Sequence, residues 1–180
     1  MEADGKGEAH LFMGPFETDS SASSANRTVL GQAGEELGSA VSFVGDIDLD
    51  GLADLTLASL ISNRVYVCWS SQLGELGTVN AAEQCLTMIG PSDSAAGAAV
   101  AGLGDTNGDG LSEFAVGAPI ASAVYLVEAP LEGTLELSSV KTLQDTGSPA
   151  GPGVAIEMID EPGVPSAPAP GGRFGGLIYS

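Results

Sequence analysis

The stretch GDIDLDGLAD, residues Gly45 to Asp54, places four carboxylates around one glycine, at Asp46, Asp48, Asp50 and Asp54. Like charges at this spacing repel one another unless a cation lies between them. Calcium binds roughly six to eight oxygen atoms, and alternate side chains converge on one ion when the backbone curls around it. Gly51, at position six counted from Asp46, allows the positive φ that such a curl requires. The stretch therefore predicts a calcium-binding loop.

A second acidic stretch, GDTNGDGLSE, begins at Gly104 and places Asp105 59 residues after Asp46. Positions one, three, five and nine of each loop supply side-chain oxygens, and position seven supplies a backbone carbonyl. These candidate ligands are Asp46, Asp48, Asp50, Leu52 and Asp54 in the first loop, and Asp105, Asn107, Asp109, Leu111 and Glu113 in the second. Because Asn107 removes one negative charge, the first of the two predicted Ca²⁺ sites should bind more tightly.

Other interpretations of the loops differ in what they require. An EF-hand needs a bidentate Glu at position twelve, where this chain has Leu57 and Val116. Mg²⁺ fits less well because it prefers few protein ligands and retains several waters. An acidic turn without any ion remains the alternative, since Asp and Gly are favoured in turns.

The spacing of 59 residues extends beyond the acidic loops. It carries 29–31 (VLG) onto 88–90 (MIG), and 37–41 (LGSAV) onto 96–100 (AGAAV). Segments such as SAVSFVGD, ADLTLAS and EFAVGA are short, apolar or alternating, and bounded by Gly, Asp and Ser, which predicts strands. A degenerate third copy ends in GGLIYS, and GEAHLFMGP (7–15) resembles the closing strand of an earlier copy with His10 in the position of the closing tyrosine.

Repeats of about 55 to 60 residues with about four antiparallel strands each are typical of propeller blades. The sequence therefore predicts an all-β fold: a partial β-propeller of about three four-stranded blades in an incomplete ring. The predicted boundaries are 1–28 for the end of a preceding blade, 29–84 for repeat one, 85–142 for repeat two, and 143–180 for a degenerate repeat three.

The charge balance limits the partners. Lys and Arg number 5 against 24 Asp and Glu, which gives a formal net charge of −19. Nucleic acids and anionic membranes require a basic surface, so neither is expected as a partner. No apolar run approaches the roughly 18 to 20 residues that span a bilayer, and MEADGKGEAH lacks the apolar segment of a signal peptide. We therefore expect a fragment of a longer chain.

Several single residues allow more than one interpretation. Cys68 and Cys85 could form a cross-strand disulfide or remain two buried thiols. His10, the only histidine, has no partners placed for a catalytic triad. Trp69 could stack on a sugar but is also consistent with strand packing, and Asn26 begins a glycosylation sequon. The aspartate spacing explains metal binding better than a pair of catalytic carboxylates, so the chain is not expected to be an enzyme.

The blocks LGSAVSFVGDIDLDGLADLTLAS and AGAAVAGLGDTNGDGLSEFAVGAP resemble FG-GAP repeats, which build the seven-bladed β-propeller of integrin α subunits. The chain departs from the family pattern at the FG element, which is Leu37-Gly38 and Ala96-Gly97. The GAP element survives only as Gly117-Ala118-Pro119, whereas the first copy has Ala58-Ser59-Leu60.

The resemblance implies that the acidic loops hold structural Ca²⁺. It also implies an extracellular or cell-surface module that binds a protein or carbohydrate ligand. The remaining blades of a parent propeller, or copies associating at exposed sheet edges, are further expected partners. The alternatives are an accessory domain of a secreted enzyme, of polysaccharide lyase or phospholipase type, or a carbohydrate-binding module.

Overall fold

The computed structural model describes residues 5–14, 21–73 and 77–144, and these residues form short strands joined by tight turns. The strands are β1 (Glu8–Leu11), β2 (Arg27–Leu30), β3 (Ala40–Gly45), β4 (Asp54–Ser59), β5 (Arg64–Cys68), β6 (Gly77–Asn80), β7 (Leu86–Ile89), β8 (Ala99–Gly104), β9 (Glu113–Ala118), β10 (Ala123–Val127), β11 (Leu135–Glu136) and β12 (Lys141–Gln144). The helical turns are η1 (Ala22–Ser24), α1 (Ser70–Leu73), α2 (Ala81–Gln84) and η2 (Leu137–Ser139). The predicted all-β class is confirmed.

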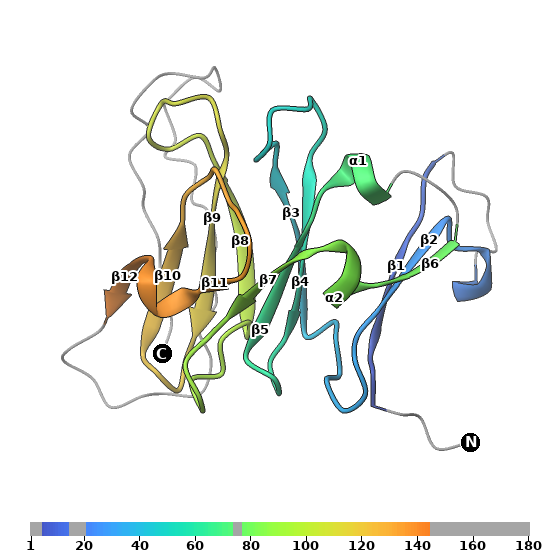
Figure 1. Ribbon diagram of the computed structural model, residues 1–180, viewed down its shortest axis with the longest axis horizontal. Coiled ribbons are helices and arrows are strands. Elements are labelled where there is room, and N and C mark those ends of the chain that lie inside the picture. The colour runs from blue at the N-terminus through green and yellow to red at the C-terminus, as the bar shows by residue number, and fades with distance from the viewer. Residues whose placement is uncertain (1–4, 15–20, 74–76, 145–180) are drawn as a thin grey trace, which may run out of the picture.

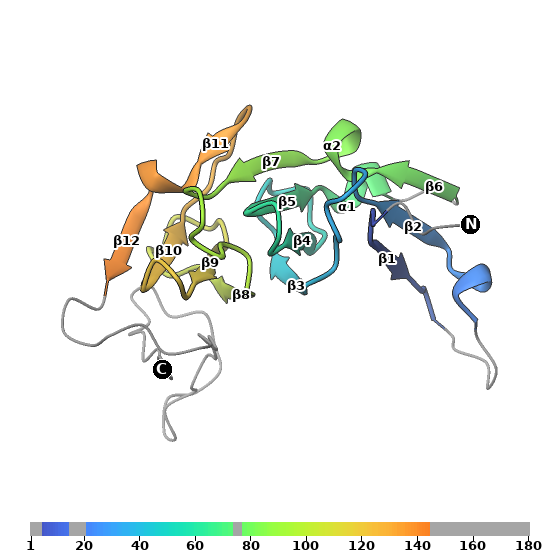
Figure 2. The same ribbon diagram turned by 90° about the horizontal axis from the view of Figure 1, so that it is seen from below.

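The strands form three sheets that stand side by side along the molecule (Figure 1). The first sheet has the order β1-β2-β6, the second β11-β7-β5-β4-β3, and the third β12-β10-β9-β8. Viewed from below, the sheets fan out so that β3 and β8 lie on one side of the molecule, while β7, α2 and β11 lie on the other (Figure 2). This arrangement is rich in antiparallel pairs, as the sequence predicts.

The repeat of 59 residues appears directly in the strands. β3, β4 and β5 begin at residues 40, 54 and 64, and β8, β9 and β10 begin at 99, 113 and 123. The two meanders also share their register. A bulge in β3 brings Gly45 opposite Asp54, and the equivalent bulge in β8 brings Gly104 opposite Glu113. The two acidic loops therefore start from the same local backbone geometry.

The register also relates the first sheet to the others. Tyr66 of β5 lies opposite Thr87 of β7, and Tyr125 of β10 lies opposite Thr142 of β12. In the first sheet His10 of β1 lies opposite Thr28 of β2, and the His10 Nδ1 to Thr28 Oγ1 distance is 3.1 Å. β1 and β2 therefore correspond to the last two strands of a four-stranded meander.

Two features differ from simple four-stranded antiparallel blades. β6 pairs with β2 in parallel, and β11 pairs with β7 in parallel, so each adds a strand beyond the outer strand of a meander. In addition, β2 pairs with β1 and β6 rather than with β3, so the sequence repeat that begins near residue 29 is out of phase with the sheets. Of the third predicted repeat, residues 145–180 lie outside the described residues.

Hydrophobic side chains fill the spaces between neighbouring sheets. Val29, Leu57 and Tyr66 belong to the cluster between the first and second sheets. Val44, Met88 and Phe114 belong to the cluster between the second and third sheets. A third, smaller cluster, Leu103, Ala115 and Val124, lies on the third sheet alone. The two larger cores therefore lie between sheets.

β3 and β8 approach each other closely between the second and third sheets. A Cβ at Gly102 of β8 would lie 2.8 Å from the carbonyl oxygen of Phe43 and 2.8 Å from the Cα of Val44. Only glycine leaves room for this contact between two backbones. The absence of a side chain at residue 102 therefore sets the distance between the two sheets at this edge.

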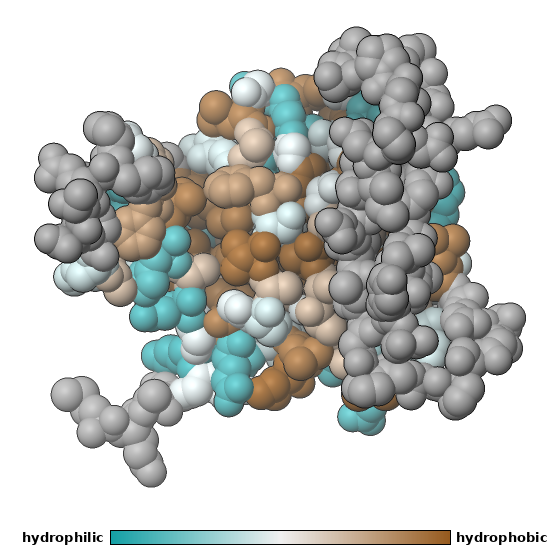
Figure 3. Space-filling view, turned by 180° about the vertical axis from the view of Figure 1, so that it is seen from behind, coloured by the Kyte–Doolittle hydropathy of each residue, from teal (hydrophilic) through white to brown (hydrophobic). Residues whose placement is uncertain are grey.

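The opposite face of β3 remains uncovered by the described residues. Val41 and Phe43 lie opposite Leu57 and Leu55, whose side chains face the first sheet. The first sheet has no strand beside β3, and Val41 and Phe43 are 53% and 59% exposed. Figure 3 shows apolar residues gathered in the middle of the face seen from behind. The molecule thus presents an apolar strand face to solvent.

Across the described residues, no helix combines the length and apolar character needed to cross a bilayer.

Candidate metal-binding loops

The two acidic loops connect β3 to β4 and β8 to β9, and both lie at the same end of the molecule (Figure 1). They touch each other, because the backbone N–H of Ser112 donates to the carbonyl of Asp46 over 3.0 Å. A Cβ at Gly45 would also lie 2.3 Å from Ser112 Oγ. The loops therefore form one continuous acidic surface across two sheets.

In the first loop the carboxylates are held by backbone N–H groups of the loop itself. Asp46 Oδ2 accepts from Gly51 over 2.9 Å, and Asp48 Oδ1 accepts from Asp50 over 3.1 Å. Asp50 Oδ1 accepts from Leu52 over 2.8 Å. Short-range bonds of this kind are typical of Asp in turns. They fix the direction of each carboxylate and leave its second oxygen available.

The second loop repeats the same bonds. Asp105 Oδ2 accepts from the N–H of Gly110 over 2.9 Å, Asn107 Oδ1 accepts from Asp109 over 2.9 Å, and Asp109 Oδ1 accepts from Leu111 over 2.8 Å. Positions one, three and five thus bond to the N–H groups of positions six, five and seven in both loops. The two loops therefore share one pattern of hydrogen bonds although their sequences differ.

The curl brings oxygen atoms together. One carboxylate oxygen from each of Asp46, Asp48 and Asp50 lies within 4.8 Å of the others, and the same holds for Asp105, Asp109 and Glu113. Asn107 turns its amide nitrogen toward the second group, because its Nδ2 donates to Asp109 Oδ2 over 3.0 Å and to Glu113 Oε1 over 3.3 Å, while its Oδ1 accepts from the N–H of Asp109. Clustered carboxylate oxygens are among the ligands that Ca²⁺ prefers.

One oxygen in the first loop lacks a protein partner. Asp46 Oδ1 is buried and accepts no hydrogen bond from any described residue. A buried acceptor without a partner is costly, by about 1–3 kcal/mol and more when it is charged. A cation beside Asp46 Oδ1 would remove that cost, so the donor set fits a hard divalent ion.

The ninth residue of each loop is fully buried. Asp54 accepts from the backbone N–H of Ile47 over 3.0 Å and of Ser70 over 2.9 Å. Burial raises the pKa of Asp54, the bonds from Ser70 and Ile47 partly lower it, and the charges of Asp48 and Asp50 raise it further. Asp54 therefore connects the loop to α1 through Ser70, and its pKa depends on the charges of Asp48 and Asp50.

Glu113 holds the equivalent place in the second loop. Its Oε2 accepts from the N–H of Thr106 over 2.6 Å and also from the Thr106 hydroxyl. Unlike Asp54, Glu113 contributes one carboxylate oxygen to the group with Asp105 and Asp109. The longer side chain therefore reaches both the backbone and the centre of the loop.

Position six has the predicted backbone geometry. Gly51 has φ 87° and Gly110 has φ 92°, both in the left-handed region that favours glycine. At position four the loops differ, because Leu49 has φ 63° where the second loop has Gly108 at φ 82°. The backbone N–H groups of Leu52 and Leu111 donate within the loops, and their predicted role as carbonyl ligands remains a prediction.

Cys68 and Cys85 form a disulfide. Cys68 ends β5 and Cys85 follows α2 directly, so the bond closes the segment that contains α1, β6 and α2. Of the two alternatives left open by the sequence, two separate thiols is wrong. A structural disulfide is typical of proteins from oxidising compartments.

Glu35 is a buried acidic residue that the sequence analysis missed. Its Oε1 accepts from the hydroxyl of Tyr66 over 2.6 Å and of Ser62 over 3.2 Å, and it lies 3.4 Å from Nη1 of Arg64. Its Oε2 accepts from the N–H of Gln32 over 2.7 Å. Burial and then the bond to Glu35 raise the pKa of Tyr66. The sequence spacing does not predict the cluster around Glu35, because residues 35 and 66 are far apart in the sequence and come into contact only in the folded chain.

No family model matches the chain. Its curated relatives include integrin alpha-3 of Cricetulus griseus and integrin alpha-3 of Mus musculus, each 32% identical over 114 residues. Those residues cover 58% of this chain and 10% of each relative, so the chain spans about a tenth of the length of the relatives it matches. The chain is thus distantly and partially similar to integrin α subunits.

Proposed function

We propose that the chain is a calcium-stabilised segment of a β-propeller that serves outside the cell as a non-enzymatic module for adhesion or ligand binding. The observation that carries the proposal is the pair of equivalent acidic loops, in which the same hydrogen bonds aim carboxylates at one point. The meanders repeated every 59 residues, the disulfide and the similarity to integrin alpha-3 support it.

In this proposal the first ion is held by Asp46, Asp48, Asp50 and Asp54 with the carbonyl of Leu52, and the second by Asp105, Asn107, Asp109 and Glu113 with the carbonyl of Leu111. The chemistry that the ion supplies is charge neutralisation. The backbone N–H groups of each loop keep the carboxylates oriented, and Asp54 and Ser112 connect the loops to α1 and to each other.

Calcium bound in this way stabilises the folded state by mass action, by about 2.7 kcal/mol at a free concentration one hundred times the Kd. The ions would fix the ends of the β3–β4 and β8–β9 hairpins. Loops at the faces of repeat proteins commonly bind ligands, and a stiff loop loses less entropy when a ligand binds.

The test is thermal unfolding of the chelated protein during titration with Ca²⁺. The melting temperature should rise, and Asp50→Ala and Asp109→Ala should each reduce the rise, with the variant at the tighter first site showing the larger loss at low calcium. Asp93→Asn is the matched control, because Asp93 is exposed, lies outside the loops and has φ 56°, which Asn accepts. A melting temperature that ignores calcium in the unmodified protein would overturn the proposal.

A further inference from the structure

A cavity of about 400 Å³ lies beside the disulfide, on the side of the molecule that carries β7 and α2 (Figure 2). Three separate segments meet there: α1 with the preceding Trp69, α2 with the start of β7, and the loop before β11. The described residues that line it are Trp69, Gln72, Ala82, Gln84, Cys85, Leu86, Thr87, Leu131, Gly133 and Thr134. The disulfide links the first two of these walls.

The lining combines one aromatic ring with uncharged polar groups. Trp69 is half-buried, and it packs against the core between the second and third sheets while also lining the cavity. Gln72 and Gln84 are exposed at the rim. The side-chain amides of Gln72 and Gln84 can both donate and accept hydrogen bonds, and so can the hydroxyls of Thr87 and Thr134. The indole contributes a large apolar surface with a negative face.

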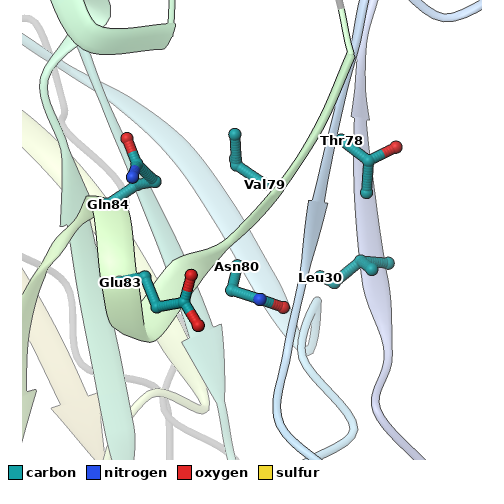
Figure 4. Close-up of a pocket in the computed structure, with 6 residues that line it drawn as sticks. All are labelled: Leu30, Thr78, Val79, Asn80, Glu83 and Gln84. Carbon is teal, nitrogen blue, oxygen red and sulfur yellow. The ribbon is translucent and has the colours of Figure 1, made fainter.

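The cavity differs from the rest of the molecule in its charge. None of its described lining residues is ionisable at neutral pH, although the chain carries 24 acidic residues. The neighbouring pocket, shown in Figure 4, differs because Glu83 of α2 lines it together with Leu30 and Thr78 from the strands opposite. Gln84 lines both pockets. The net charge of −19 would repel an anionic ligand.

From this combination we propose that the Trp69 cavity binds a neutral saccharide. The apolar C–H face of a sugar ring packs on the indole, while its hydroxyl groups, which both donate and accept, pair with the amides of Gln72 and Gln84 and the hydroxyls of Thr87 and Thr134. A volume of about 400 Å³ falls in the range of small-molecule sites. The inference deepens the proposed ligand-binding function and rests on it.

The experiment uses the fluorescence of Trp69, the only tryptophan of the chain. The full chain, saturated with Ca²⁺, is titrated with cellotetraose, mannotetraose and N-acetylchitotetraose. At least one of these sugars should change the emission in a saturable way. Gln72→Ala and Gln84→Ala should each weaken that binding about fivefold, the equivalent of one ordinary hydrogen bond. Both residues are exposed, so these variants should keep the fold.

Glu83→Gln, which alters only the neighbouring pocket, is the matched control and should leave the affinity unchanged. The proposal is overturned if none of the three sugars changes the emission up to about 20 mM, which means a binding free energy weaker than roughly 2.3 kcal/mol. It is also overturned if Gln72→Ala binds as tightly as the parent. A peptide with the sequence of residues 162–170, PGVPSAPAP, tests a proline-rich ligand instead, and binding of that peptide without binding of any sugar would also overturn the proposal. Failure here leaves the calcium-dependent melting temperature untouched, so it is distinguishable from failure of the proposed function.

Discussion

Tyr66 and Glu35 show how a single contact joins two sheets. The hydroxyl of Tyr66, from the second sheet, donates over 2.6 Å to Glu35, which lies in the connection between β2 of the first sheet and β3 of the second. Both side chains are almost fully buried. A hydrogen bond to a charged group in such surroundings contributes about 1.5–3 kcal/mol. Loss of the Tyr66 proton would therefore remove this contribution to the packing of the two sheets.

The raised pKa of Tyr66 predicts a loss of stability in alkaline solution. Because the folded-state pKa lies above the unfolded value of about 10, the contribution of Tyr66 is complete below that value and is lost as the pH rises beyond it. Urea unfolding at pH values from about 8 to 11 should show the decline.

Tyr66→Phe is the variant that tests this interpretation. It should be less stable than the parent near pH 8, by about 1.5–3 kcal/mol, and should decline less steeply above pH 10. Part of the decline should remain, because burial also raises the pKa of Tyr125. Equal alkaline slopes for the parent and Tyr66→Phe would contradict the assignment.

At the scale of elements, the contact between β3 and β8 depends on glycine. Gly102→Ala would place a methyl group 2.8 Å from the backbone of Phe43 and Val44. Overpacking of this kind costs about 1–3 kcal/mol, which should appear as a lower urea midpoint with an unchanged m-value. Phe43→Ala, at the equivalent position of the other repeat, should have a smaller effect because Phe43 is exposed. Similar losses in both variants would contradict the close approach.

The disulfide also acts at the scale of elements, because it links the end of β5 to the end of α2. Cys68 and Cys85 are 17 residues apart, and cross-links that close loops of this length stabilise proteins by about 3 kcal/mol. The double variant Cys68→Ala/Cys85→Ala should lose about that much in chemical denaturation, and a reducing agent should no longer affect it. The parent protein under reducing conditions is the matched comparison. An unchanged unfolding midpoint after reduction would contradict a structural role for the bond.

The sequence predicted those elements that local spacing determines. The alternating aspartates around Gly51 and Gly110 indicated the two hairpin loops, and the matching apolar segments indicated β3 to β5 and β8 to β10. The parallel pairs of β6 with β2 and of β11 with β7 could not be predicted, because each joins segments about 50 residues apart. The short helices α1 and α2 carry too few residues for a periodic pattern.

Parts of the candidate site escaped prediction for the same reason. The spacing of positions one to nine identified the acidic residues, yet it could not show that Asp54 bonds to Ser70 or that Ser112 reaches Asp46. Those contacts depend on how α1 and the neighbouring sheet pack. The position of Glu35 beside Tyr66 and the walls of the Trp69 cavity likewise depend on long-range packing.

At the scale of the whole molecule, the exposed face of β3 departs from an ordinary globular surface. Val41 and Phe43 are both more than half exposed and stand on the same face of the strand. Adjacent exposed apolar residues on an edge strand promote pairing with other chains. The high negative charge opposes such association in low salt and does so less when salt screens it.

We therefore expect concentration-dependent self-association that increases as the ionic strength rises from about 0.01 M to 0.15 M, where the screening length shortens. Light scattering after size-exclusion chromatography measures it. Phe43→Ser should reduce the association, whereas Ile61→Ser should not, because Ile61 is 58% exposed but lies in the turn between β4 and β5 rather than on an edge strand. Equal association of both variants would place the contact elsewhere on the surface.

The two repeats assign different residues to the same place on their first strands. Where β8 meets β3 the chain has Gly102, and 59 residues earlier it has Phe43. A strand that packed on the open side of β3 would contact the ring of Phe43. On its other side, β3 contacts β8 at Gly102, which has no side chain. The ring forces a wider separation on the open side, so the next layer cannot copy the spacing between the second and third sheets. Any partner that covers this side must carry a recess for Phe43, and that requirement selects among partners by shape before any charge is considered.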